Sequence, residues 1–239
     1  SVRLSSVSVF RNILKSDVLS AFCDFISYEG GDRERMRLYG EFIFSLKDCG
    51  NSFSDFLKRA VSEDENLYIV SKARKKDVPE SVEKNLINEL ETFSLLSEIT
   101  GEDLFEESGY EGYIPLFENE KTDFTAFYKE RAERVASLGY GIFTSKAMFR
   151  IEDDEIVPVG SADDISLSSF VGYEKERETV ALNTKAFLED RDAANVLLCG
   201  DAGTGKSSTV KAVANMFFNK GIRLIELRKD QLAHLPFVM

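Results

Sequence analysis

The sequence has few of the side chains on which most metal and nucleophilic chemistry depends. It has three cysteines, Cys23, Cys49 and Cys199, and one histidine, His234, in 239 residues. The cysteines are too few and too far apart for a disulfide framework and form no CxxC pair, so we expect them to be reduced and mostly buried. A single histidine removes most His-based chemistry, because a His-rich zinc site, a Ser-His-Asp arrangement or a histidine acid–base pair needs better placed partner residues, and we expect His234 to be a surface or capping residue.

Basic charge and long apolar runs are also missing. The formal net charge of −12 argues against a generally basic groove for nucleic acid. The nearest basic run, residues 72–76, is expected to be solvated. No segment reaches the roughly twenty apolar residues that a membrane helix needs, and no signal peptide is visible. We therefore expect a cytoplasmic protein with neither a membrane nor a nucleic-acid partner.

The first part of the chain shows the spacing of amphipathic helices. Apolar residues recur at intervals of three and four up to about Leu138. The phenylalanines at this spacing are typical of a core rather than of a cofactor pocket. We predict a mainly α-helical domain over residues 1–145. Its helices are expected over residues 10–25, 36–46, 53–60, 82–96 and 124–138, the second closing near Gly50, the fourth at a left-handed Gly101 and the last at Gly139.

The pattern changes after Gly141. Two apolar stretches, residues 148–151 and 156–159, flank Asp153-Asp154 and indicate either a β-hairpin or an extended connector, so residues 146–163 are assigned to a hairpin or linker that ends in a polar joint over residues 160–164. Helical spacing returns between Tyr173 and Asp190. Residues 195–199 are then a short, continuous apolar run, which is typical of a strand covered on both faces in a parallel sheet.

A phosphate-binding motif follows this predicted strand. Residues 200–207 fit GxxxxGK[ST] at every fixed position and precede an amphipathic helix, the setting of a P-loop. Glycines in the loop permit positive φ, so backbone N–H groups turn inward around a phosphate. The helix, from Lys206 to about Asn219, adds the positive end of its dipole. The loop residues are Gly200, Asp201, Ala202, Gly203, Thr204, Gly205, Lys206 and Ser207, and the inward helix residues are expected to be Val210, Val213, Ala214 and Phe217.

Each polar residue of the motif has an expected role. Lys206 is expected to bridge the β- and γ-phosphates, Ser207 to coordinate Mg²⁺ and Ser208 to donate to the α-phosphate. A glycine-rich turn that merely ends a strand would explain the glycines but not the Lys-Ser pair. No [NT]KxD guanine-reading pattern occurs in the chain, so the predicted ligands are ATP or ADP with Mg²⁺.

Around this loop the chain resembles a known family. Residues 164–174, DISLSSFVGYE, with the following helix and P-loop, are similar to the opening of an AAA+ ATPase module, in which a Val-Gly element borders the adenine. More narrowly, VGYEKERETVALNTKAFL, ANVLLCGDAGTGKSSTVKA and GIRLIELRKDQLAHL resemble a bacterial family of predicted AAA+-like ATPases whose cellular role is unassigned. This likeness covers about residues 124–239. It implies that Phe170, Val171, Gly172 and Tyr173 flank the base, whereas the residues alone also fit the start of a packed helix.

The resemblance also implies parts that these residues do not include. Residues 221–227 indicate the next strand, which in the resembled order precedes the Walker B strand, so Glu226 is assigned a structural role. A Walker B acid, sensor residues and an arginine finger, the last worth about 10³–10⁵ in rate, would follow Met239. We therefore expect an α/β chain in which a helical domain is followed, over residues 164–239, by a truncated P-loop domain, namely the first portion of its three-layer αβα fold. No catalytic residue and negligible hydrolysis are expected here, with Lys206 supporting phosphoryl charge.

Three functions remain open on this basis. The leading hypothesis is the ATP-binding module of an AAA+-like ATPase whose helical domain recognises a protein partner. The second is a P-loop kinase or phosphotransferase, although such enzymes usually carry the loop near the start of their only domain. The third is an adaptor that senses nucleotide without hydrolysing it. The sequence leaves open whether the protein forms a homo-oligomer.

Overall fold

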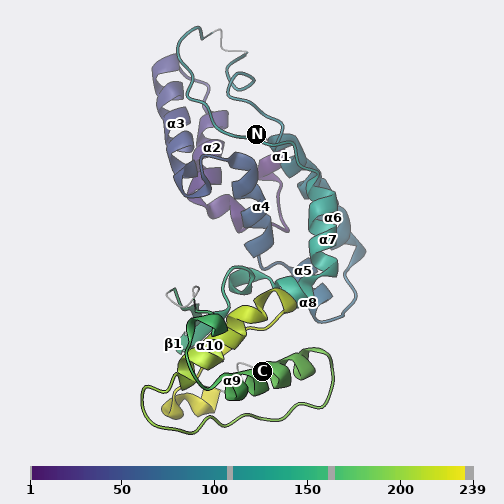
Figure 1. The fold of residues 1–239 in the computed structure, drawn as a ribbon. Helices are drawn as coiled ribbons and strands as arrows, with labels where there is room; N and C mark the ends of the chain where they lie inside the picture. Colours follow the sequence, from purple (N-terminus) through teal and green to yellow (C-terminus); the bar gives the residue numbers. More distant parts are fainter. Residues whose placement is uncertain (1, 107–109, 161–164, 235–239) are drawn as a thin grey trace. The chain divides into compact units, whose positions relative to one another are not determined.

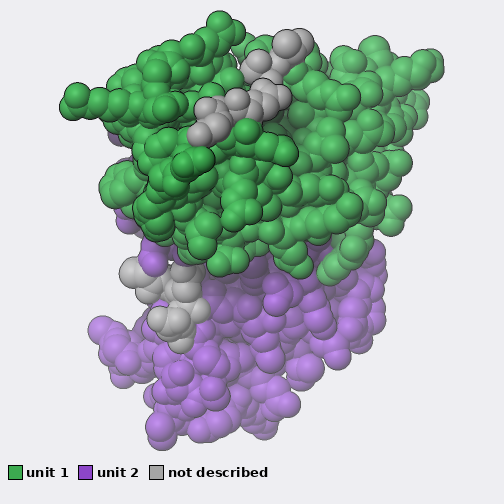
Figure 2. Space-filling view, turned by 90° about the horizontal axis from the view of Figure 1, so that it is seen from above, with its two compact units in different colours: residues 1–135 green, residues 136–239 purple. Residues whose placement is uncertain are grey.

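The computed structural model describes residues 2–106, 110–160 and 165–234, and the chain divides into two compact units, residues 1–135 and 136–239 (Figures 1 and 2). Residues 161–164, which contain most of the predicted polar joint, lie outside the described residues, as does the side chain of His234. None of the described helices is long and apolar enough to cross a membrane.

The first unit is helical. Its helices are α1 (Val2–Ser5), α2 (Asp17–Ser27), α3 (Asp32–Ser45), α4 (Phe53–Glu63), α5 (Leu67–Ala73), α6 (Glu80–Leu96) and α7 (Phe124–Glu133), followed by α8 (Val135–Leu138) (Figure 1). Short polar side chains begin several of them: Ser16 accepts from the N–H of Leu19, and Ser52 from that of Asp55. The predicted helical character of this region agrees with the structure.

The core of this unit is aromatic, as the spacing predicts. The rings of Phe22, Phe42 and Phe53 are almost completely buried, with centroids 5.0–5.2 Å apart. Tilted and edge-on pairs at this separation add about 0.5–1.5 kcal/mol each beyond the area they bury. These phenylalanines therefore pack against one another.

Three helix predictions need correction. The helix expected over residues 10–25 begins only at Asp17, because Ser16 is extended (ψ 149°) and caps the helix. The helix expected over residues 124–138 breaks at Arg134. Gly101 is not the left-handed end of α6, which already ends at Leu96. A Cβ on Gly101 would lie 2.7 Å from the hydroxyl of Tyr39, so close approach rather than backbone conformation favours glycine there.

A buried carboxylate attaches the start of the chain to α6. Glu89, 6% exposed, accepts from the backbone N–H groups of Ser8, Val9 and Phe10 and from the Ser8 hydroxyl, at 2.7–3.1 Å. Three successive amides thus surround one carboxylate, which compensates for the removal of its charge from water.

A second buried acid lies between α4 and α5. Asn66 caps α5 through its Oδ1 and donates from Nδ2 to Asp64 (2.9 Å) and to the Tyr128 hydroxyl (3.0 Å). Burial raises the pKa of the Asp64 carboxyl and, more strongly, that of the Tyr128 phenol.

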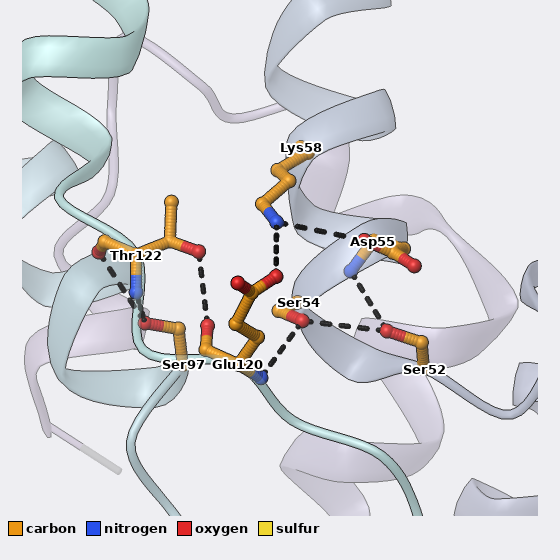
Figure 3. Close-up of polar contacts among 7 residues, drawn as sticks. All are labelled: Ser52, Ser54, Asp55, Lys58, Ser97, Glu120 and Thr122. Atoms are coloured by element: carbon orange, nitrogen blue, oxygen red, sulfur yellow. Dashed lines mark hydrogen bonds and ion pairs between the residues drawn. The ribbon is translucent and has the colours of Figure 1, made fainter.

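The segment that precedes α7 is held against α4 and α6 by polar contacts. Glu120 donates its N–H to Ser54 Oγ (3.0 Å) and accepts from Lys58 Nζ (3.2 Å) (Figure 3). Thr122 donates its N–H to Ser97 Oγ (2.9 Å). These contacts hold an irregular chain segment without a helix or strand of its own.

The second unit contains a mixed sheet of β1 (Met148–Glu152), β2 (Glu155–Pro158) and β3 (Leu224–Glu226), in the order β2-β1-β3. β1 and β2 form an antiparallel hairpin, so the hairpin alternative is confirmed, and Asp153 and Asp154 turn it with φ of 46° and 64°. β3 pairs in parallel with β1. The helices α9 (Glu174–Leu188) and α10 (Lys206–Met216) also belong to the second unit.

The predicted strand over residues 195–199 is wrong for the described structure. These residues belong to no strand, and Leu197 is 85% exposed. A strand forms only beside a partner that accepts and donates its backbone hydrogen bonds; the partner of β3 is β1, and no described strand lies beside 195–199. The chain is therefore a mixed α/β protein with a helical first unit and a small sheet, while the three-layer P-loop fold stays a prediction.

The cysteines also differ from expectation. Cys23 and Cys49 are half-buried, and all three are free, but Cys199 is exposed because the segment that carries it is uncovered. The basic run of residues 72–76 lies at the end of α5 and in the turn after it, where its charged side chains are exposed, as predicted.

Candidate functional site: a phosphate-binding loop

The glycines of the motif adopt the backbone conformations for which glycine is suited. Gly200, Gly203 and Gly205 have φ of 150°, 83° and 82°. A Cβ on Gly203 or Gly205 would meet nothing within 4 Å, so backbone conformation and not space favours glycine at these two positions. The loop therefore has the alternating geometry in which successive N–H groups can face one anion.

The loop leads directly into α10. Gly205 is the residue before the helix, and it provides no side-chain cap. The first N–H groups of a helix have no partner within it, so they and the helix dipole favour an anion at this position. Thr209 anchors the first turn by donating its hydroxyl to the Gly205 carbonyl at 2.9 Å.

Packing of α10 follows the prediction in part. Val213, Ala214 and Phe217 are buried, but Val210 is 36% exposed, which corrects its predicted inward position. Thr209 and Ala212 are buried instead. The buried face is thus rotated from the one that the apolar residues alone predict, because a threonine that bonds to the loop carbonyl lies inward.

The ammonium group of Lys206 lies over its own loop. It donates to the carbonyls of Gly200 (2.9 Å) and Asp201 (2.7 Å), and Thr204 Oγ1 lies 3.3 Å away. All three acceptors are neutral. Since a charged acceptor forms a hydrogen bond about twice as strong, a phosphate oxygen can compete with these carbonyls for the ammonium group.

A pocket of about 510 Å³ opens beside the loop within the second unit. One set of lining residues comes from the start of α9, namely Tyr173, Glu176, Arg177 and Val180, and the other comes from the loop and its neighbours, namely Leu197, Leu198, Cys199, Gly200, Asp201, Thr204, Lys206 and Thr209. Its volume lies in the range of small-molecule sites.

Of the four residues expected to flank the base, residues 170–173, one lines the pocket and another is almost fully exposed. Tyr173 lines the pocket, with φ of 56°, whereas Val171 is 96% exposed. The Gly172 N–H donates to the carboxylate of Glu174 at 2.9 Å, and backbone N–H groups, with Arg177 as a smaller contributor, lower the pKa of that carboxylate. The ring of Phe170 lies 4.8 Å from the Arg177 guanidinium.

The serine residues expected at the metal and the α-phosphate lie at the start of α10. Ser207 is exposed and Ser208 half-buried. In the described part of the chain no group of three acidic, histidine or cysteine side chains is placed to hold a metal ion. Mg²⁺ in phosphate sites is commonly held by one or two protein oxygens together with phosphate oxygens and water, so the Ser207 hydroxyl fits that role without such a cluster.

Sequence reasoning did not identify Glu176, Arg177, Cys199 and Thr209 as pocket residues. One signal was available: Arg177 lies four residues after Tyr173, so both fall on one face of a helix. The burial of an arginine, by contrast, has no local signature.

These observations define a mixed α/β protein with a glycine loop, a following helix and a pocket beside them. A family model described as "Protein of unknown function (DUF815)" matches residues 144–239, which include the loop, α9, α10 and the sheet. No curated protein and no solved structure matches the chain. The second unit is therefore similar to a family whose description assigns no function.

Proposed function

We propose that residues 200–208 bind the phosphates of ATP, with Mg²⁺, and that the chain is the nucleotide-binding part of an AAA+-like ATPase. One observation carries this proposal: the motif combines positive-φ glycines, an uncapped helix start and a lysine ammonium group in one loop, and Gly200, Thr204 and Lys206 of that loop line one pocket. A turn that only ends a strand requires none of these together.

Binding would exchange the partners of Lys206. Its ammonium group would leave the carbonyls of Gly200 and Asp201 for phosphate oxygens, while the N–H groups at the start of α10 face the same phosphates. Ser207 would hold Mg²⁺, which supplies charge neutralisation when bound. Tyr173, the one residue of the expected base-flanking set that lines the pocket, is the candidate for contact with adenine.

The test is calorimetric titration of the protein with Mg-ATP, comparing wild type with Lys206→Ala and Lys211→Ala. Both lysines lie on α10, but Lys211 does not line the pocket. Loss of a charge-assisted hydrogen bond of about 1.5–3 kcal/mol predicts about 10- to 150-fold weaker binding for Lys206→Ala. Lys211→Ala should bind as wild type does. Equal affinity in wild type and Lys206→Ala would refute the proposal.

The products of the intact protein separate the ATPase from its two alternatives. Release of phosphate to water supports the ATPase. A phosphorylated acceptor would indicate a phosphotransferase, and tight binding without turnover would indicate a nucleotide-sensing adaptor.

A further inference from the structure

Arg177 is a largely buried arginine whose guanidinium has no acceptor among the described residues. It is 7% exposed, and its guanidinium lies 4.8 Å from the centroid of the Phe170 ring. Across the described ranges that guanidinium makes no hydrogen bond or ion pair with another residue. A guanidinium carries five N–H donors, and arginine is almost never buried unless it is paired. Contact with one ring leaves those donors without protein partners, and since no Arg177 nitrogen is among the buried unpaired atoms of the described residues, the donors are open to the pocket that Arg177 lines.

Neither its neighbours nor its helix explain this position. Glu174, one helical turn before Arg177, directs its carboxylate to the N–H of Gly172 and interacts with the Arg177 charge only at a distance, and neither Glu176 nor Glu178, its neighbours on α9, forms an ion pair with it. Arg177 itself lies in the first turn of α9, where the helix dipole disfavours a positive charge. Neither helix stability nor an internal ion pair therefore accounts for a buried arginine here.

The guanidinium lies where a ligand in the pocket can reach it. Arg177 lines the same pocket as Lys206, and the two residues come from different helices. We propose that Arg177 is a second cationic contact of this pocket and binds oxygens of the phosphate chain. The proposal rests on the proposed nucleotide function and adds to it a residue outside the P-loop motif.

A phosphate fits the guanidinium better than a nucleobase does. The group has donors and no acceptor, and a negative ligand satisfies its charge as well as its donors. Phosphate oxygens accept two parallel N–H bonds from the planar fork, and Phe170 restricts the orientation of that plane. A neutral base would accept hydrogen bonds but would leave the charge uncompensated.

The experiment compares three ligands, Mg-ATP, inorganic tripolyphosphate and adenosine, on wild type, Arg177→Met and Arg177→Lys. Arg191→Met is the control, because Arg191 is exposed, pairs with Glu189 and does not line the pocket. We expect Arg177→Met to bind ATP and tripolyphosphate about tenfold or more weakly, as loss of a charge-assisted contact implies, with adenosine unaffected. Arg177→Lys should fall in between, since it keeps the charge but not the fork.

The outcomes distinguish this inference from the proposed function. If wild type binds neither ATP nor tripolyphosphate, the proposed function fails. If wild type binds and Lys206→Ala does not, but Arg177→Met binds both ligands normally, only the role of Arg177 fails. Weaker ATP binding with unchanged tripolyphosphate binding would assign Arg177 to the base or ribose and overturn the phosphate contact. Should circular dichroism show that Arg177→Met is unfolded, Arg177→Lys decides: unchanged affinity for tripolyphosphate overturns the proposal.

Discussion

The carboxylate of Glu89 offers a quantitative test of how the first unit is held together. Replacement by glutamine keeps the size of the side chain but exchanges one oxygen for an NH₂ group. Oε1 accepts from Ser8 and Val9, and Oε2 accepts from Val9 and Phe10. Whichever oxygen is replaced, the new NH₂ group faces a backbone N–H, so a buried donor loses its acceptor.

The expected loss follows from this geometry. An unsatisfied buried donor costs about 1–3 kcal/mol, and the remaining bonds lose their charge assistance. The lower desolvation cost of a neutral amide offsets part of this loss. We expect Glu89→Gln to lower the free energy of unfolding of the first unit by about 2–4 kcal/mol, which corresponds to about 6–15 °C in Tm for a unit of this size.

Urea denaturation followed by near-ultraviolet circular dichroism measures this loss in the first unit, because the buried tyrosines Tyr39, Tyr68 and Tyr128 all lie there. Glu91→Gln is the matched control, since Glu91 is an exposed glutamate on the same helix. We expect the control to change stability by less than about 0.5 kcal/mol. If Glu89→Gln were as stable as Glu91→Gln, the reasoning about the buried carboxylate would be refuted.

Two further predictions concern pH and the loop. Burial raises the pKa of the Asp64 carboxyl in the folded state, so the folded state binds the carboxyl proton more tightly than the unfolded chain does. The contribution of Asp64 to stability therefore becomes more favourable as the pH falls through the raised pKa. Wild type should therefore gain stability relative to Asp64→Asn between about pH 7 and pH 4 in urea titrations; a difference independent of pH would contradict this. Gly205→Ala should weaken Mg-ATP binding about 5- to 30-fold, because a Cβ costs about 1–2 kcal/mol at this φ and the free loop can change conformation to relieve that strain, whereas a loop around bound phosphates cannot. Gly160→Ala, where φ is not positive and the Cβ meets nothing, should leave calorimetric affinity unchanged, and equal affinity of both variants would contradict the strain argument.

Local patterns were sufficient for much of the first unit. The spacing of Phe22, Phe42 and Phe53 predicted helices with an aromatic core. Such features depend on residues within one or two helical turns, so the sequence contains the necessary information. The same holds for the glycine loop and the start of α10 at Lys206, because positive φ and an uncapped helix start follow from the local residues.

Long-range contacts decided the rest. The apolar run at residues 195–199 has the composition of a buried strand, but a strand also needs a partner, and β3 pairs with β1 instead. Glu89 and Arg177 are charged residues that any local pattern places at the surface, yet each is buried. Glu89 is buried because the backbone N–H groups of Ser8, Val9 and Phe10, some eighty positions away, donate hydrogen bonds to its carboxylate. Sequence alone thus determined the helical character and the glycine loop before α10, whereas strand pairing and the burial of charge required the tertiary structure, because both depend on groups that are distant along the chain.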